Sequence, residues 1–179
     1  MFISVKELEL KKLRFDVAFP PGEIDYADDG DRLNQASPLQ AEGSAELLPH
    51  TVGEIRVRGR LAVTMRCDCN RCLEPAEFPI DSSFDLFYRP AGGAEDDEEV
   101  EIEEGEAELA FYEGDGFDLK DVLREQVLLT MPMQRLCRPD CMGMCPICGQ
   151  NRNLIHCGCE AKLVDDRWSA LKKVQVKGI

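Results

Sequence analysis

The chain has 179 residues, 44% of them hydrophobic and 31% charged, with a formal net charge of −14. This length suits one main hydrophobic core with a small appended module, and no stretch approaches the roughly 20 apolar residues of a membrane-spanning helix. Charged residues interrupt residues 1–20 and exclude the apolar core of a secretory signal, so we expect a cytoplasmic protein with no membrane partner.

An acidic run accounts for most of the negative charge. Residues 95–108 hold ten Asp and Glu and no Lys or Arg, so the rest of the chain has a formal charge of only −4. Such a run is typical of a solvated loop, and we place an acidic loop at residues 91–107. The total charge therefore does not decide between a nucleic-acid partner and a protein partner.

The first half of the chain has the composition of β-structure. Residues 2–19 contain β-branched and aromatic residues suited to extended structure, and the Pro-Pro-Gly sequence that follows ends the segment. Residues 26–38, rich in Asp, Gly and Asn, have the composition of a loop. Two strands are then expected at residues 41–48 and 53–67, joined by a short turn into a hairpin.

The second of these strands has the clearest period of two in the sequence. Its apolar residues alternate with Arg56, Arg58 and Arg60, which places the two sets on opposite faces. A further strand at residues 77–88 also repeats apolar residues on one parity, so we expect an antiparallel sheet with one wet face. If RNA binds directly, the three arginines are the predicted phosphate contacts; the alternative is an ordinary solvated face.

Helical signals appear after the acidic run. A short strand is expected at residues 109–112, and Asp118 then offers an N-cap to a helix that runs to about Thr130 and ends at Pro132. Apolar residues at helical spacing predict that this helix covers the sheet. Residues 165–174 predict a short amphipathic helix near the C-terminus.

These elements define an α+β fold class, in which an antiparallel β-sheet carries a packing helix and precedes a C-terminal cysteine-rich zinc module. We divide the chain at the end of the long helix. Residues 1–132 would form the α+β domain, and residues 133–179 would form the zinc-binding module with its short helix.

Eight of the nine cysteines form four close pairs. Structural zinc sites use four thiolates, and a two-residue spacer lets both sulfurs of a pair face one ion. In the expected reducing compartment, these short spacings favour metal binding over disulfides. We therefore predict two zinc ions per chain, with these ligands: Cys69 and Cys72, Cys137 and Cys141, Cys145 and Cys148, Cys157 and Cys159.

Proximity along the chain favours one division of the four pairs. The last two pairs would hold one ion, and the first two would hold the other, which would tie the tip of the central hairpin to the segment after the helix. The alternative joins the two middle pairs and leaves Cys69 and Cys72 with Cys157 and Cys159. Gly149 permits the tight turn that a cysteine knuckle needs.

Two further residues near the pairs could act as ligands. Cys67 ends a strand on its apolar parity, and we interpret it as a small buried residue, with metal ligation as the alternative. His156 beside Cys157 is an alternative ligand, but enough thiolates are already present.

No arrangement of residues indicates catalysis. The sequence contains no Ser-His-Asp set, phosphate-binding glycine loop or His-Glu-x-x-His helix, so we expect the protein not to be an enzyme. The spacing Cys141-x3-Cys145-x2-Cys148 also occurs in radical S-adenosylmethionine enzymes. Only 31 residues follow it, too few for their barrel and cofactor site.

Five segments carry a resemblance to a known family: residues 69–73 (CNRCL), the helix at 118–132, the cysteine run at 136–149, Cys157-Gly158-Cys159, and the end at 166–173. In combination they are specific. They resemble the YceD-type large ribosomal RNA subunit accumulation proteins of bacteria and plastids, and the resemblance spans most of the chain.

The resemblance implies a noncatalytic role in the accumulation or processing of large-subunit (23S) ribosomal RNA, and therefore in ribosome biogenesis. The implied partners are this RNA or a ribosome-assembly protein, with no small-molecule substrate. Two alternative functions are a zinc-thiol redox regulator and a protein-interaction adaptor. The chain departs from the family pattern at Arg152 and in carrying Cys67, and neither residue is one of the eight proposed ligands.

Overall fold

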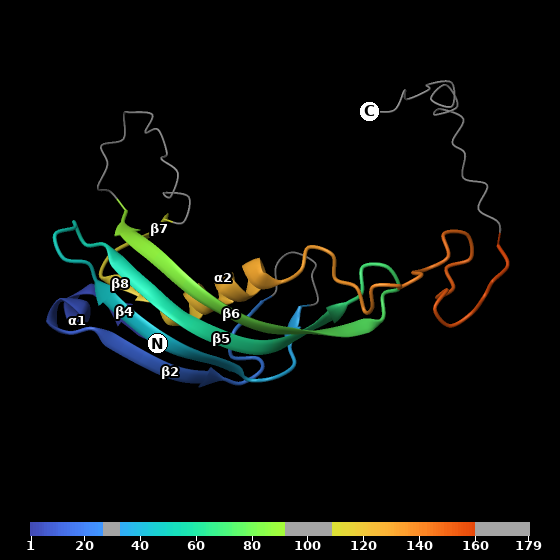
Figure 1. Cartoon of the computed structure of the whole chain (residues 1–179), viewed down its shortest axis with the longest axis horizontal. Helices are drawn as coiled ribbons and strands as arrows, with labels where there is room; N and C mark the ends of the chain where they lie inside the picture. Colours follow the sequence, from blue (N-terminus) through green and yellow to red (C-terminus); the bar gives the residue numbers. More distant parts are fainter. Residues whose placement is uncertain (27–32, 92–108, 160–179) are drawn as a thin grey trace, which may run out of the picture.

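The computed structural model describes residues 1–26, 33–91 and 109–159, which form an α+β fold built on one large sheet (Figure 1). The predicted acidic loop, apart from residue 91, and the predicted helix at 165–174 lie outside these residues. No helix among the described residues has the length and apolarity that crossing a bilayer requires.

The large sheet has the strand order β2-β4-β5-β6-β7, and the short strand β3 also pairs with β5. Its neighbours are antiparallel, as expected, except for β6 and β7, which run parallel. Parallel neighbours need a long connection instead of a tight turn, and residues 91–108 separate these two strands. The strand bounds are β2 (Leu13–Phe19), β3 (Asn34–Gln35), β4 (Leu39–Leu47), β5 (Ile55–Asp68), β6 (Pro75–Pro90) and β7 (Leu109–Tyr112).

Strands β5 and β6 form a long hairpin that positions the candidate site. They pair without interruption from Ile55 opposite Tyr88 to Asp68 opposite Pro75. The hairpin tip extends beyond the rest of the sheet and meets the segment that follows α2 (Figure 1). Along β5, odd-numbered residues such as Val57 and Leu61 are buried in the core, so the arginines between them lie on the opposite, solvent-facing side.

The N-terminal segment is extended in β1 (Phe2–Ser4) and β2, as expected, but a short helix lies between them. After β1, residues Val5–Leu10 form helix α1, and β1 pairs with β8 (Gly116–Asp118) in a separate two-stranded sheet. The sequence VKELEL consists mainly of good helix formers, and only Leu8 is buried in this helix. One buried residue in six suits a short helix at the edge of the core better than a strand, in which alternate residues share a face.

Helix α2 (Leu119–Thr130) confirms the predicted helix and its cap. The side chain of Asp118 accepts a hydrogen bond from the backbone N–H of Lys120 at 2.9 Å, which satisfies one free donor of the first turn. The helix buries one apolar face against the sheet, and each fully buried aliphatic side chain contributes roughly 1.5–3 kcal/mol. The buried residues are Leu119, Val122, Leu123 and Val127.

Candidate metal centres

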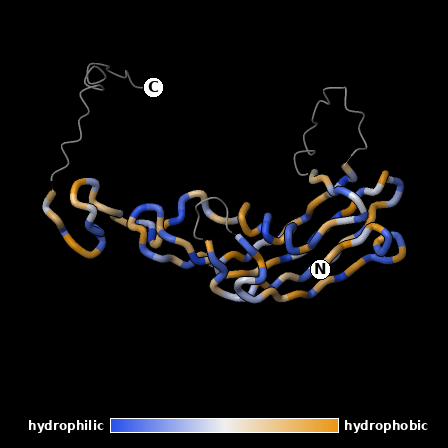
Figure 2. Tube along the Cα trace, turned by 180° about the vertical axis from the view of Figure 1, so that it is seen from behind, coloured by the Kyte–Doolittle hydropathy of each residue, from blue (hydrophilic) through white to orange (hydrophobic). Residues whose placement is uncertain are grey.

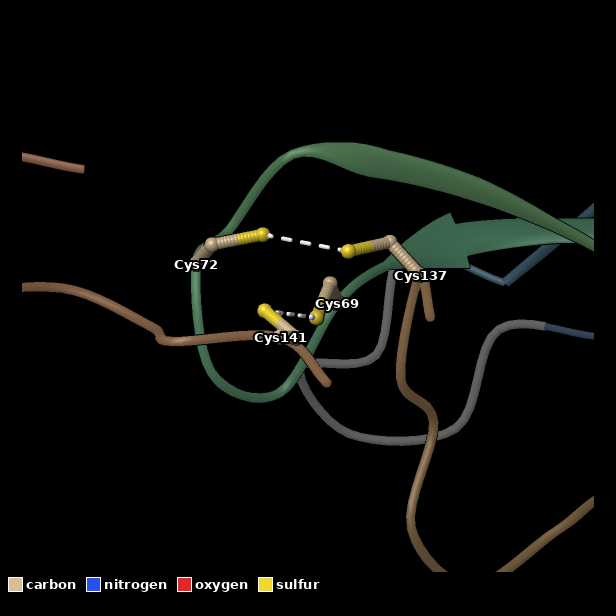
Figure 3. A group of neighbouring side chains, drawn as sticks. All are labelled: Cys69, Cys72, Cys137 and Cys141. Carbon is tan, nitrogen blue, oxygen red and sulfur yellow. Dashed lines mark hydrogen bonds between the residues drawn. The ribbon is translucent and has the colours of Figure 1, made fainter. Parts of the chain in front are cut away.

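The first candidate centre joins two parts of the chain that are distant in sequence. Cys69 and Cys72 lie in the loop at the tip of the β5–β6 hairpin, and Cys137 and Cys141 lie in the segment after α2. Figure 3 shows the four side chains pointing toward one another, with Cys69 paired to Cys141 and Cys72 paired to Cys137. All four sulfur atoms lie within 4.8 Å of one another.

The sulfur–sulfur distances match a four-thiolate metal site. The Sγ atoms of Cys69 and Cys141 are 3.8 Å apart, and those of Cys72 and Cys137 are 3.6 Å apart. Four sulfurs placed tetrahedrally at about 2.3 Å from a zinc ion would be about 3.8 Å from one another. A disulfide would instead need a sulfur–sulfur distance of about 2.0 Å. The arrangement therefore fits one tetrahedrally bound ion.

Backbone hydrogen bonds shape the hairpin tip around the first centre. The N–H of Leu73 donates to the carbonyl of Cys69, and the N–H of Cys69 donates to the carbonyl of Glu74, both at 2.9 Å. Leu73 has a positive φ of 60°, which closes this tight turn. The N–H of Asn70 donates to the carbonyl of Arg135 at 2.7 Å, so the segment after α2 is held against the turn.

The second centre is local in sequence. Cys145, Cys148, Cys157 and Cys159 also bring their sulfur atoms within 4.8 Å of one another. Gly149 adopts a φ of +71°, which L-residues with side chains rarely adopt, and its N–H donates to the carbonyl of Cys145 at 2.9 Å. This turn places the first two sulfurs on one side of the loop.

The two centres are attached to each other through Gly143 and Arg71. Gly143 has a φ of +70°, and a Cβ at this position would lie 3.0 Å from the carbonyl oxygen of Arg71. That oxygen accepts a hydrogen bond from the N–H of Met144 at 2.8 Å. The Arg71 guanidinium also donates to the carbonyl of Cys141 at 3.1 Å. The second loop is therefore anchored to the hairpin tip.

Within each set, the pKa values of the thiols are shifted in opposite directions. Burial raises the pKa of Cys69, but hydrogen bonds from the backbone N–H groups of Cys72, Arg71 and Cys137 outweigh it and lower that pKa to about 6. Burial of its thiol and the neighbouring thiols raise the pKa of Cys137 to about 12.

The thiol pKa values of the second set are also shifted in opposite directions. Backbone hydrogen bonds from Cys148 and Ile147 lower the pKa of Cys145 to about 6, and the thiols of Cys148 and Cys157 raise the pKa of Cys159 to about 12. Neighbouring thiolates repel one another, so four of them ionise together only around a cation. The donor set of four sulfurs suits a thiophilic divalent ion such as zinc.

The structure groups the cysteines in the division that proximity along the chain favoured, and the alternative division is not formed. That these residues bind metal stays a prediction. Cys67 is buried in the main core, as expected, and belongs to neither set. His156 is exposed and also lies outside both sets.

The predicted RNA-contacting arginines lie on the solvent face of β5, but two of them are paired. Arg56 donates from Nε to Asp85 at 2.7 Å, and Arg60 donates from Nε to Asp81 at 2.7 Å; each also makes a second bond from Nη2. Arg58 is exposed and makes no side-chain hydrogen bond to any described residue. Their part in RNA binding stays a prediction.

Sequence reasoning missed the residues that support the sites. Asn153 contacts Cys141 of the first centre although it lies between two ligands of the second. Asp81 and Asp85 neutralise arginines from the neighbouring strand. Strand register could have indicated the aspartates, because they fall on the polar parity of β6, whereas nothing in the spacing indicated Asn153.

Together, fold and site define a class: an α+β protein whose central hairpin and C-terminal segment meet at two candidate four-thiolate metal centres. The chain belongs to the YceD family. The family described as large ribosomal RNA subunit accumulation protein YceD matches residues 57–175, which include most of β5, all of β6 and α2, and all eight clustered cysteines. The resemblance found in the sequence is thereby confirmed.

Individual relatives are distant. Proteins of Mycobacterium tuberculosis (strain H37Rv) and Mycobacterium bovis, named only as uncharacterized, are 29% identical over 118 residues, or 65% of this chain and 54% of the relative. A maize protein named large ribosomal RNA subunit accumulation protein YCED homolog 1, chloroplastic, is 25% identical over 135 residues, or 63% of this chain and 46% of its own length.

The chain thus spans about half the length of the curated relatives it matches. No solved structure matches the chain significantly.

Proposed function

We propose that this protein is a noncatalytic factor in the accumulation or processing of large-subunit ribosomal RNA, and therefore in ribosome biogenesis. The observation that carries the proposal is the family match over residues 57–175, because the family is described by a role in accumulation of this RNA. The maize relative carries the same role in its name.

Two zinc ions per chain are part of the proposal, each held by one set of four cysteines. Zinc bound by four protein thiolates has no open position for water or substrate, so it would act as a structural clip. The first ion would fix the segment after α2 to the hairpin tip, and the second would hold the loop beyond it. The sulfur–sulfur distances and the opposed thiol pKa values support this assignment.

A fold held together by two metal ions suits holding an RNA or an assembly protein in place during subunit maturation. Such a factor acts in proportion to its amount. Rescue of a deletion strain should therefore require protein in amounts comparable with assembling subunits, and a trace amount should fail.

The decisive experiment is deletion of the gene followed by measurement of large-subunit to small-subunit ribosomal RNA at matched growth. We expect the ratio to fall, or precursor ends to persist, and wild-type protein to restore both. A Cys72→Ser variant should restore them poorly, whereas Arg152→Ala, which changes an exposed side chain, should restore them fully. An unchanged ratio with normal precursor ends would reject the proposed role.

Metal analysis tests the cofactor separately. Protein purified without added metal should contain two zinc ions per chain. A ratio near one, or iron with visible absorbance after purification without oxygen, would contradict the two-zinc assignment and leave the RNA role standing.

A protein-binding adaptor is the second candidate, favoured by exposed apolar side chains at the cysteine-rich end. Met133, Leu73 and Leu154 are 98%, 63% and 75% exposed, and Ile147 and Ile155 are also exposed. Figure 2 shows apolar segments in the outer loop of this end as well as along the sheet. A zinc ion with four thiolates carries a formal charge of about −2, so the metal-loaded end would favour a protein surface over phosphate.

Crosslinking in cells separates the two candidates. Ribosomal RNA recovered with this protein after protease treatment would support direct RNA binding. A ribosomal or assembly protein crosslinked through the cysteine-rich end, with no RNA, would support the adaptor.

A further inference from the structure

Asn153 lies in the loop between Cys148 and Cys157 of the second cysteine set, but its side chain contacts the first set. Its Nδ2 atom is 3.3 Å from the Sγ atom of Cys141, a hydrogen-bond distance when sulfur is the acceptor. Asn153 is half-buried, so water competes only partly for this contact. One side chain therefore links the loop of the second centre to a ligand of the first.

The other side of the amide is also occupied, which fixes its orientation. Its Oδ1 atom accepts hydrogen bonds from the backbone N–H of Met142 at 2.8 Å and from the guanidinium of Arg138 at 2.9 Å. Both donors belong to the segment that carries Cys137 and Cys141. With two donors facing Oδ1, the Nδ2 group is the one that faces sulfur.

The loop that presents Asn153 lies between Cys148 and Cys157 of the second set and is held by hydrogen bonds. The N–H of Cys145 donates to the carbonyl of Gln150, and the N–H of Arg152 donates to the carbonyl of Gly143. Asn151 closes the turn by accepting hydrogen bonds from the backbone N–H and from Nδ2 of Asn153. An ion bound by the cysteines on both sides of this loop would fix its two ends, and so the position of Asn153.

We propose that Asn153 couples the two metal centres, so that metal bound by the second set strengthens binding by the first. The inference depends on the proposed zinc binding. An N–H donor aimed at a metal-bound thiolate orients the ligand and offsets its charge, and loss of such an outer partner typically reduces metal affinity roughly 10–100-fold. Coupling is reciprocal, so the first ion strengthens the second by the same factor.

A double-mutant cycle on the full chain tests the coupling. Cys145→Ser disables the second set, and Asn153→Asp keeps the acceptor for Met142 and Arg138 but removes the donor to Cys141. Zinc affinity of the first set is measured by competition with a chelator in the four combinations. We expect Cys145→Ser to weaken the first set about tenfold or more when Asn153 is present, and to have little further effect once Asn153 is replaced.

Cadmium NMR of the cadmium-loaded chain gives a second measure, since each centre gives its own resonance. Asn153→Asp and Asn153→Ala should both shift the resonance that survives in Cys145→Ser. Arg152→Ala is the matched control, because its side chain makes no hydrogen bond to a described residue, and it should shift neither. Circular dichroism confirms that the variants fold.

Each outcome decides the proposal. If Cys145→Ser weakens the first set equally with and without Asn153, the coupling does not pass through this residue. An unchanged affinity and resonance in Asn153→Asp would also overturn the proposal. A wild-type chain that binds fewer than two metal ions would refute the proposed zinc sites themselves, which is a different failure.

Discussion

The two cysteine sets have the same chemistry but different places in the fold. In the first set Cys69, Cys72 and Cys141 are at most 3% exposed, and the contacting cysteines are 65 and 72 residues apart in sequence. In the second set only Cys145 is buried, and all four ligands fall within residues 145–159. The first set therefore joins distant parts of the chain, whereas the second shapes one loop.

This difference has energetic consequences. A crosslink restrains the unfolded chain more when the loop it closes is longer, and by the disulfide analogy a loop of about 65 residues is worth about 4 kcal/mol and one of about 10 residues nearer 3 kcal/mol. The first set also packs with Leu136 as a small buried cluster of its own, which adds burial energy to the metal's contribution. The first set should dominate stability.

The largest expected effect is on thermal unfolding. Cys72→Ser should lose one metal ion, lower the free energy of unfolding by about 4 kcal/mol and lower the Tm by roughly 10 °C. Cys148→Ser should also lose one ion, but its change in Tm should be smaller, because the loop that the second set closes is short. Calorimetry with metal analysis measures both. Equal shifts would show that the two sets contribute alike to the global fold.

The second largest expected difference between the two sets is the rate at which they release metal. The second set has two exposed cysteines, Cys148 and Cys159, whereas the first has one, Cys137, and chelators and peroxide reach exposed thiolates first. With excess chelator we expect two phases, the faster at least about tenfold quicker than the slower. Cys148→Ser should remove the fast phase, and Cys72→Ser the slow one, while the proposed coupling should quicken the phase that remains. If peroxide released the metal of the first set before that of the second, the expected order would be wrong.

Acid should distinguish the cysteine-rich end from the sheet. Hydrogen bonds from Arg60 and Arg56 lower the pKa values of Asp81 and Asp85. A carboxylate with a lowered pKa stabilises the fold above the ordinary Asp pKa of about 4, and this contribution is lost only as pH falls through the lowered value. Protons displace zinc from thiolates at pH values above the range in which these two aspartates become protonated.

Acid titration should therefore release both metals before the sheet unfolds, as followed by zinc release and far-UV circular dichroism. Asp81→Asn combined with Asp85→Asn should bring the two transitions closer together. Simultaneous loss of metal and sheet in the wild type would show that the sheet depends on the metal for its structure.

The smallest expected effect is on the binding of large-subunit ribosomal RNA, and it applies if the protein binds that RNA directly. Of the three arginines predicted to contact RNA, Arg58 is the one without a bidentate aspartate partner, so Arg58→Gln should weaken binding and reduce the salt slope by about one phosphate contact. Arg56→Gln and Arg60→Gln should have smaller effects. Titration of RNA at several salt concentrations measures this, and three equal effects would show that RNA displaces the aspartates.

Local sequence signals predicted much of the fold. Alternation along residues 53–67 predicted β5 and its buried face, and the cap at Asp118 with apolar helical spacing predicted α2. The spacing of the cysteines identified eight candidate ligands and favoured the division that the structure shows. These features depend on neighbours along the chain, where period, capping and spacing act directly.

Tertiary structure decided the rest. Helix α1 replaced the expected extended segment because its place at the edge of the core buries only Leu8, and β7 joined the sheet in parallel. The pairing of Arg56 with Asp85 depends on the register between β5 and β6, which no single strand specifies. Asn153 meets Cys141 only after two loops pack together, so a contact from the loop of one centre to a ligand of the other has no periodic signal in the sequence.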